Sequence, residues 1–168
     1  MLILLLKSKE MIKINLEIFK RVNSKHQLQF VVNDRMNIDK SKNRILFEIS
    51  SLSEDNHKIK TVEYFMDIDD CKYLCFLVLN DKFYKEFHKV RGKDGIARAI
   101  TISKKPYKNE FYYSIKIDKG TGSSKNNGFT NFENKDEGLY YNISNEDMIK
   151  LCLAIKDRIF QRELLFLK

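Results

Sequence analysis

The sequence predicts an α+β protein made of two consecutive ββββα units, each an antiparallel sheet followed by a helix. Three observations predict this fold class. Apolar and polar residues alternate with the period of a strand through most of the chain. The alternation changes twice to helical spacing, after Met66 and after Ile143. The two points of change also match each other at one fixed offset along the sequence, which indicates an internal repeat.

In the first half, we expect four strands, because apolar residues occupy every second position over 12–18, 28–32, 45–49 and 62–66. The segments between them are rich in Asn, Asp, Ser and Lys, as is typical of connections between antiparallel strands. Asp67 is then a candidate N-cap with Asp70 three residues later. The apolar spacing that follows predicts a helix to about His88.

The second half repeats this plan. Strands are expected over 96–103 and 111–118, with a short one over 129–132 and a last one over 139–143. Ser144 and Asp147 form a candidate capping box, which opens a helix that continues through Ile159. The sequence therefore predicts one domain, 1–168, with a first unit at 11–88 and a second unit at 89–168.

An offset of 77 residues aligns a strand end, a cap and an apolar helix face at once. The aligned pairs are Tyr64 and Tyr141, Met66 and Ile143, Asp67 and Ser144, Asp70 and Asp147, Leu74 and Leu151, Cys75 and Cys152, Val78 and Ile155, and Phe83 and Phe160. The first of these helices is also apolar outside the stripe that would face a sheet, as at Tyr73 and Phe76. A helix that is apolar all round is buried all round, so either the second helix or another subunit covers it. We expect a homo-oligomer that forms through the helices.

The positive charge is concentrated in one part of the chain. Residues 82–125 hold twelve basic and four acidic residues, which accounts for the whole formal net charge of +8. A field of this sign raises the local concentration of an anionic partner such as nucleic acid or an acidic membrane. We therefore expect an anionic partner to bind this quarter of the chain.

The cysteines and the N-terminal residues indicate which cellular compartment and which cofactors to expect. Cys71, Cys75 and Cys152 are odd in number and lie in apolar helical patterns, so we expect buried free thiols, no disulfides, no metal and no cofactor. The apolar run near the first residue is only five residues long, too short for a membrane span or a secretory signal. We expect a cytoplasmic protein without a membrane partner, and Met11 is a candidate first residue of the native chain.

The second-half strands predict a binding face. Ile100, Ile102, Ile115 and Ile117 would point to the core, which leaves small residues, Tyr112 and lysines on the other side. Such a face suits a single-stranded nucleic acid, because bases stack on aromatic rings while Lys and Arg neutralise phosphates. The predicted contacts are Lys89, Arg91, Lys93, Arg98, Lys104, Lys105, Tyr112, Lys116, Lys119 and Lys125.

No catalytic arrangement is expected. No nucleophile stands beside a base in a recognisable turn, and the glycine-rich segment 120–128 lacks the GxxxxGK[ST] spacing of a nucleotide-binding loop. Two other interpretations remain open. One is an enzyme that uses segment 120–128 on a phosphorylated small molecule, and the other is a protein–protein assembly module that binds a partner through exposed apolar surface.

Two successive units of four strands and a helix resemble the Whirly and positive-cofactor superfamily of single-stranded nucleic-acid-binding proteins. The resemblance rests on the junctions "YFMDIDD" and "YYNISNED" and the strands "GIARAITISKK" and "FYYSIKIDKG", and it covers roughly residues 12–160. The Whirly motif KGKAAL is only loosely similar to "RGKDGIARAI". The resemblance implies binding of single-stranded DNA, or of RNA, with little sequence preference, in transcription, replication or repair. It also implies helices at the centre of an oligomer.

Overall fold

The computed structural model describes residues 16–36, 43–93, 95–124 and 130–166. The first unit consists of β1 (Glu17–Asn23), a short 3-10 turn (Ser24–His26), β2 (Leu28–Arg35), β3 (Arg44–Leu52), β4 (Lys58–Asp67) and α1 (Ile68–Leu79). The second unit consists of β5 (Glu86–Lys93), β6 (Ile96–Tyr107), β7 (Glu110–Ser124), β8 (Thr130–Ser144) and α2 (Asn145–Phe166). The predicted ββββα duplication is confirmed.

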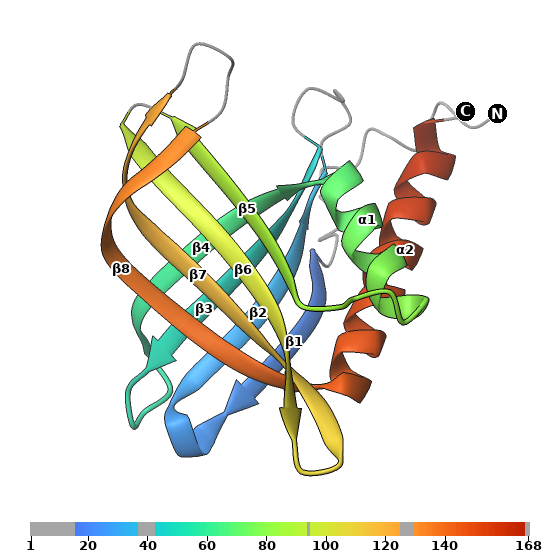
Figure 1. The fold of residues 1–168 in the computed structure, drawn as a ribbon, viewed down its shortest axis with the longest axis horizontal. Helices are drawn as coiled ribbons and strands as arrows, with labels where there is room; N and C mark the ends of the chain where they lie inside the picture. The colour runs from blue at the N-terminus through green and yellow to red at the C-terminus, as the bar shows by residue number, and fades with distance from the viewer. Residues whose placement is uncertain (1–15, 37–42, 94, 125–129, 167–168) are drawn as a thin grey trace, which may run out of the picture.

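The two sheets are antiparallel meanders with strand orders β1-β2-β3-β4 and β5-β6-β7-β8. Figure 1 shows the second sheet in front of the first, with the strands of the two sheets crossing. Both helices lie to one side of the sheet pair, where they contact each other. Each meander thus buries one face against the other sheet and leaves its second face outside.

The two sheets share the same cross-strand register. Arg21 lies opposite Phe30, and this row continues to Ile49 and Val62 in the first sheet. The equivalent row of the second sheet is Lys89, Ile100, Ile117 and Leu139. Val62 and Leu139 are separated by the same offset that the sequence predicted for the strand–helix junctions. The repeat therefore extends from the helices into the pairing of all four strands.

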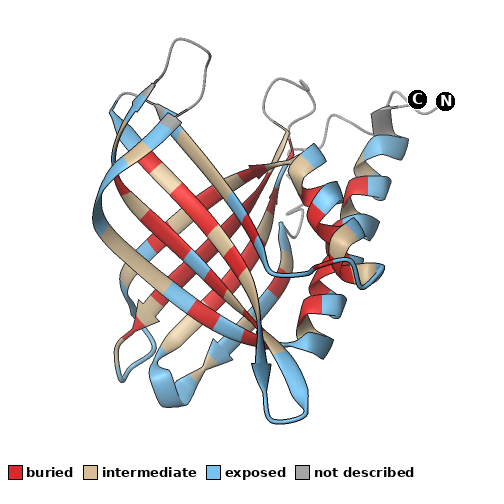
Figure 2. Cartoon of the chain, in the orientation of Figure 1, coloured by how far each residue is buried: buried red, intermediate tan, exposed pale blue. Residues whose placement is uncertain are grey.

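One hydrophobic core contains residues from both sheets and both helices. Figure 2 shows the buried residues where the sheets overlap and along the helices where they face the sheets and each other. The Sγ of Cys75 lies 3.5 Å from the carbonyl oxygen of Cys152, its equivalent in the second unit. Equivalent helix positions therefore meet at the centre of the molecule. Phe160 is exposed whereas Phe83 is buried, so the match ends there.

The first strand of each unit contacts the helix of the other unit. Arg21 on β1 donates to both carboxylate oxygens of Asp147 in α2, at 3.1 and 2.7 Å. Lys89 on β5 lies 2.7 Å from Asp70 in α1. Each cation also lies over the ring of the phenylalanine two residues before it, Phe19 or Phe87. These two reciprocal ion pairs stabilise the contact between the two units.

The expected helix to His88 is wrong, because α1 ends at Leu79. Asn80 closes the helix by donating from its backbone and its side chain to the carbonyl of Phe76, and Asp81 has a positive φ of 51° that no helix continues through. The chain then forms β5, a strand that the pattern did not predict. Its inward positions after Phe87 are Lys89 and Arg91, so apolar alternation is absent.

The two strands expected over 129–132 and 139–143 are one strand, β8, paired with β7 along its whole length. Two register shifts interrupt this pairing, at Lys119/Gly120 and Thr121/Gly122. A Cβ on Gly120 would lie 1.8 Å from the carbonyl oxygen of Asn134. Gly120 is therefore required by the close approach of β8, and the first half of segment 120–128 belongs to a strand, whereas residues 125–129 lie outside the described residues.

The first strand is displaced from its expected position. β1 covers Glu17–Asn23, whereas the alternation predicted a strand over 12–18, of which residues 12–15 lie outside the described residues. A register shift between Glu17 and Phe19 changes the alternation. Phe19 consequently lies in the core, and Ile18 only packs against it. At the helix starts, the backbone N–H of Asp147 donates to the Oγ of Ser144 as predicted, but the carboxylate of Asp67 makes no capping bond.

Candidate nucleic-acid interface

The outward side of the second sheet carries cations and rings over small polar residues. Cross-strand pairing places Thr101, Lys116 and Tyr140 in one row, with His88 at its β5 end. The adjacent rows on the same side contain Ser103, Ser114 and Asn142, and then Lys105, Tyr112 and Ser144. We call these ten residues the cationic face; the acidic Glu86 of β5 lies at the end of the Ser103 row, where its carboxylate accepts a hydrogen bond from the Oγ of Ser103. Its largest exposed side chains are those of His88, Lys105, Lys116 and Tyr140.

The open part of this side is shorter than the sequence predicted. Ala97 and Ala99, expected on the open surface, are buried at 0 % and 5 % exposure. Asp118 beside them is also buried, and its carboxylate lies 2.8 Å from both Lys116 and Lys135. The two register shifts between β7 and β8 each leave one extra residue in β8, Asp136 and Glu133, which changes the alternation of β8 at this end. The cationic face is therefore confined to the half of the sheet nearer the β6–β7 turn.

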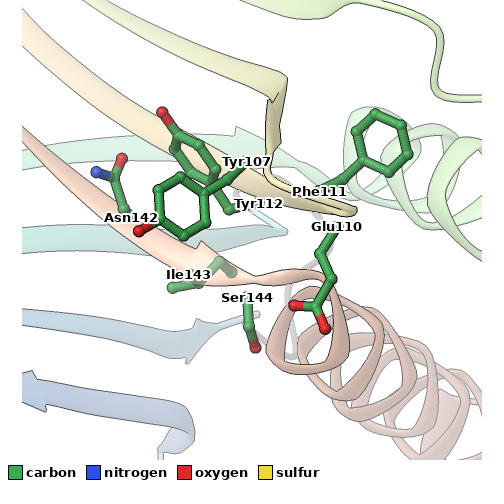
Figure 3. A pocket seen from close by; sticks show the side chains of 7 residues that line it. All are labelled: Tyr107, Glu110, Phe111, Tyr112, Asn142, Ile143 and Ser144. Atoms are coloured by element: carbon green, nitrogen blue, oxygen red, sulfur yellow. The ribbon is translucent and has the colours of Figure 1, made fainter.

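A hollow of about 460 Å³ adjoins the cationic face at that turn. Figure 3 shows Tyr107, Tyr112 and Asn142 grouped on one side, and Glu110 pointing toward Ser144. The rings of Tyr107 and Tyr112 meet edge to face, with centroids 6.5 Å apart. The other lining residues are Phe111 and Ile143. Exposed rings beside an amide, a hydroxyl and a carboxylate can stack a base and hydrogen-bond its edge.

The ten predicted contact residues do not form one surface. Lys105, Tyr112 and Lys116 lie on the cationic face. Lys89, Arg91, Lys104 and Lys119 point to the inner side of the second sheet, where each lies within 3.0 Å of a carboxylate, on Asp70, Asp67, Asp81 and Glu137 respectively. Lys93 ends β5 but its side chain is not among those described, and Lys125 lies outside the described residues. Their roles in binding stay predictions.

Arg98 shares the inner side with these ion-paired cations, opposite Arg91 on one neighbouring strand and Lys119 on the other. It lines a second hollow, of about 340 Å³, together with Arg44, Phe65, Arg91 and Gly92. We call this space the arginine hollow. It lies at the edge of the first sheet, because Arg91 donates to the backbone carbonyl of Phe65 on the edge strand β4.

The ionisable groups indicate fixed charges and buried thiols. The hydrogen bond from Lys119 lowers the pKa of Glu137, so this pair is ionised at neutral pH. Burial raises the pKa of Tyr113 to about 12 and that of Cys71 well above its ordinary value. Within the described residues, no group of three or more His, Cys, Asp or Glu side chains could hold a metal ion. The described helices include none that is long and apolar enough to cross a membrane.

The sequence prediction missed four residues of the cationic face and the adjoining hollow: His88, Tyr107, Asn142 and Tyr140. His88 was missed because β5 was interpreted as helix and linker. Tyr140 and Asn142 lie in the strand expected over 139–143, but the binding face was predicted only from the strands over 96–103 and 111–118. In β5, the apolar Phe87 followed by the polar His88 is the one step that fits the alternation of a strand.

By sequence, the chain matches no model of a known protein family and none of the curated proteins compared with it. Its structure is similar to that of WHY1 from Arabidopsis thaliana, with a TM-score of 0.58, 8% identity, and coverage of 86% of this chain and 82% of that chain. It is also similar to WHY3 from Arabidopsis thaliana, with a TM-score of 0.54, 6% identity, and coverage of 86% of each chain. At these identities the similarity concerns the fold, and the chain has a Whirly-like fold.

Proposed function

We propose that this protein is a non-catalytic, weakly sequence-specific single-stranded DNA-binding protein and that the strand crosses the cationic face. The observation that carries the proposal is the row of His88, Thr101, Lys116 and Tyr140 beside the Tyr107–Tyr112 hollow. Small central residues let bases approach, exposed tyrosines offer rings for stacking, and lysines neutralise phosphates. The Whirly-like fold supports the same class of partner.

The chemistry of the face favours a single strand over a duplex. Tyr140 is 59 % and Tyr107 63 % exposed, so each presents a ring that only an unstacked base can cover. Neither helix suits the major groove of duplex DNA: α1 is apolar, and α2 contacts α1, β1 and β7 along its length. Stacking and charge depend little on the base sequence, so the face would bind any sequence, in DNA or in RNA. A role in transcription, replication or repair follows from this class of binding.

A homo-oligomer through the helices is part of the proposal. Tyr73 and Phe76 on α1, and Leu153 and Phe160 on α2, are about half exposed in the single chain. Apolar side chains gathered on two adjacent helices favour contact with another copy. Sedimentation of the protein against a Phe76→Glu, Phe160→Glu variant tests this: a smaller assembly is expected for the variant, and equal masses would contradict it.

The direct test is fluorescence anisotropy of a labelled 30-base single strand, with duplex and RNA competitors, over a series of salt concentrations. Affinity should be greater for the single strand and should fall linearly in log salt. Lys105→Glu with Lys116→Glu should weaken binding and flatten the salt dependence. The matched control is Lys20→Glu, an exposed lysine on the outward side of the first sheet. Equal losses in both variants, or no binding at low salt, would reject the proposal.

A further inference from the structure

We propose that the arginine hollow, lined by Arg44, Phe65, Arg91, Gly92 and Arg98, is a binding site for a phosphate group. It is separate from the cationic face, because Arg98 points to the inner side of β6 whereas Thr101 and Lys105 point outward. The proposal therefore does not depend on the function proposed above.

The first argument is an excess of positive charge. Arg91, Arg98 and Lys119 lie directly opposite one another on β5, β6 and β7. Like charges in such positions repel and destabilise a sheet unless anions lie between them. Within the described residues, the ion pairs of these cations involve two carboxylates: the first, Asp67, contacts Arg91 and also Arg44, at 2.8 and 3.4 Å.

The second carboxylate, Glu137, is shared in the same way. It lies 3.0 Å from Lys119 and 3.7 Å from Lys60. Within the described residues, five cations thus surround two carboxylates, and the guanidinium of Arg98 has no hydrogen bond or ion pair. A phosphate monoester carries a charge of about −2 at neutral pH, which suits this excess.

The second argument is geometry. Arg91 is held in place by bonds of 2.9 Å from its Nη1 to the carbonyl of Phe65 and to Asp67. Arg98 keeps its planar fork of donors unused, and such a fork matches two phosphate oxygens. Gly92 adds no side chain to the wall of the hollow, which has a volume of about 340 Å³. One positioned arginine beside one unpaired arginine makes a prepared anion site.

Inorganic phosphate is the first probe, titrated at constant ionic strength against chloride while binding heat and melting temperature are measured. The wild-type protein should bind phosphate saturably and melt at a higher temperature with it. Arg98→Gln should bind phosphate roughly tenfold or more weakly, since a charge-assisted hydrogen bond contributes about 1.5–3 kcal/mol. Lys105→Gln, which removes the same charge from the cationic face, should bind phosphate as the wild type does.

The melting temperature in chloride separates binding from a structural role. Arg98→Gln removes a like charge between Arg91 and Lys119, so it should melt at the same or a higher temperature than the wild type without phosphate. Arg98→Lys keeps the charge but loses the fork, and should show intermediate phosphate affinity. A lower melting temperature of Arg98→Gln with an unchanged phosphate response, or a wild-type response no greater than with chloride, would overturn the proposal.

Two sources of phosphate are distinguished with short oligonucleotides of one sequence that carry a 5′-phosphate or a 5′-hydroxyl. Tighter binding of the phosphorylated strand, lost in Arg98→Gln, assigns a terminal phosphate. Equal binding of both, weakened equally by Arg98→Gln, assigns a phosphodiester. If Arg98→Gln weakens inorganic phosphate but changes neither oligonucleotide, the phosphate that the site binds does not belong to a nucleic acid. The result would differ if the cationic face does not bind nucleic acid. Inorganic phosphate should then still bind to the arginine hollow, and Lys116→Glu should leave the affinity for the oligonucleotide unchanged.

Discussion

The two units share one backbone plan but expose different chemistry on equivalent rows. In the first sheet, the row that faces outward is Lys20, Val31, Glu48 and Glu63. The equivalent row of the second sheet is His88, Thr101, Lys116 and Tyr140. Two carboxylates in one unit thus correspond to a lysine and a tyrosine in the other. The exposed aromatic ring that the proposed nucleic-acid interface needs is therefore present in the second row and absent from the first.

The next row repeats the contrast in packing. Leu46 of the first sheet is 2 % exposed, whereas its equivalent Ser114 is partly open. Glu48 is buried beside Ser50 and Lys58, to which it is hydrogen-bonded. Core positions are alike in the two units because both sheets fill one interior, whose packing tolerates little change in volume. The outward positions of the second sheet are open or partly open, whereas Val31, Leu46 and Ser50 on the outward side of the first sheet are buried, and there the units differ.

A third pair of equivalent sites differs in polarity. Asp34 on β2 accepts from Arg162 in α2 at 2.8 Å, and its side chain is fully buried. The equivalent residue on β6 is Lys104, which lies 3.0 Å from Asp81, just after α1. Asp81 is 90 % exposed. The ion pair that joins a strand to the helical region of the other unit is therefore buried in the first case and exposed to water in the second.

The largest expected effect follows from this difference in burial. Asp34→Ala should lower the free energy of unfolding by about 3–5 kcal/mol, because it leaves Arg162 and Arg158 without their buried carboxylate. Lys104→Ala should cost about 0.5 kcal/mol, since its partner is exposed. Urea unfolding of the two variants measures both values. Similar losses of unfolding free energy would mean that the two ion pairs contribute equally despite their different burial.

The second effect concerns the unlike rows. Lys116→Glu with Tyr140→Glu gives the second row the carboxylates of the first, and should weaken binding of a single-stranded oligonucleotide roughly ten- to a hundredfold, since stacking alone contributes about 1–3 kcal/mol per base. Anisotropy titration at one salt concentration measures it. Lys116→Glu also removes one of the two lysine contacts of the buried Asp118, so the unfolding midpoint should fall, but Lys135 still contacts this carboxylate and the variant should remain folded during the titration. An unchanged affinity would place the binding surface elsewhere.

The third effect compares the ion pairs at the two helix starts. Asp147→Asn should cost about 1 kcal/mol at pH 7, and Asp70→Asn less, because Arg21 makes two bonds and Lys89 one contact. The hydrogen bond from Arg21 lowers the pKa of Asp147 below its ordinary value. Its contribution is therefore present above about pH 4, the unfolded pKa, and is lost as the pH falls through the lowered pKa.

Urea unfolding at several pH values from 7 to 3 checks this dependence. The difference between wild type and Asp147→Asn should be constant near neutrality and should shrink below about pH 4. A difference that grows as the pH falls would show that the Arg21–Asp147 pair is not the cause.

The smallest effect tests the region where equivalent positions meet. Cys71, Cys75 and Cys152 are all buried, and burial raises the pKa of the Cys71 thiol. Because the thiolate is the reactive form, none of the three should react with a thiol reagent in the native protein at pH 8. All three should react in denaturant. Rapid labelling of Cys75 or Cys152 in the native protein would show that the contact between the two helices opens. Such opening would leave the outward sides of the two sheets unchanged.

The sequence by itself determined the duplication, the strands with clean alternation and the two helix starts. Those features depend on local periodicity and on residues such as Leu74 and Leu151, whose burial follows from helical spacing. It also indicated the outward side of β6 and β7, because Lys105, Tyr112 and Lys116 alternate with core isoleucines.

Only the tertiary structure decided which cations share a surface. β5 was not predictable from alternation because Lys89 and Arg91 point inward, and they do so because Asp70 and Asp67 of the first unit neutralise them. The sequence of a strand does not reveal which carboxylate, distant in the chain, will neutralise the cations on its inward side. For the same reason, the unpaired state of Arg98 and the burial of Ala97 under the β7–β8 bulge became visible only once the sheets were packed together.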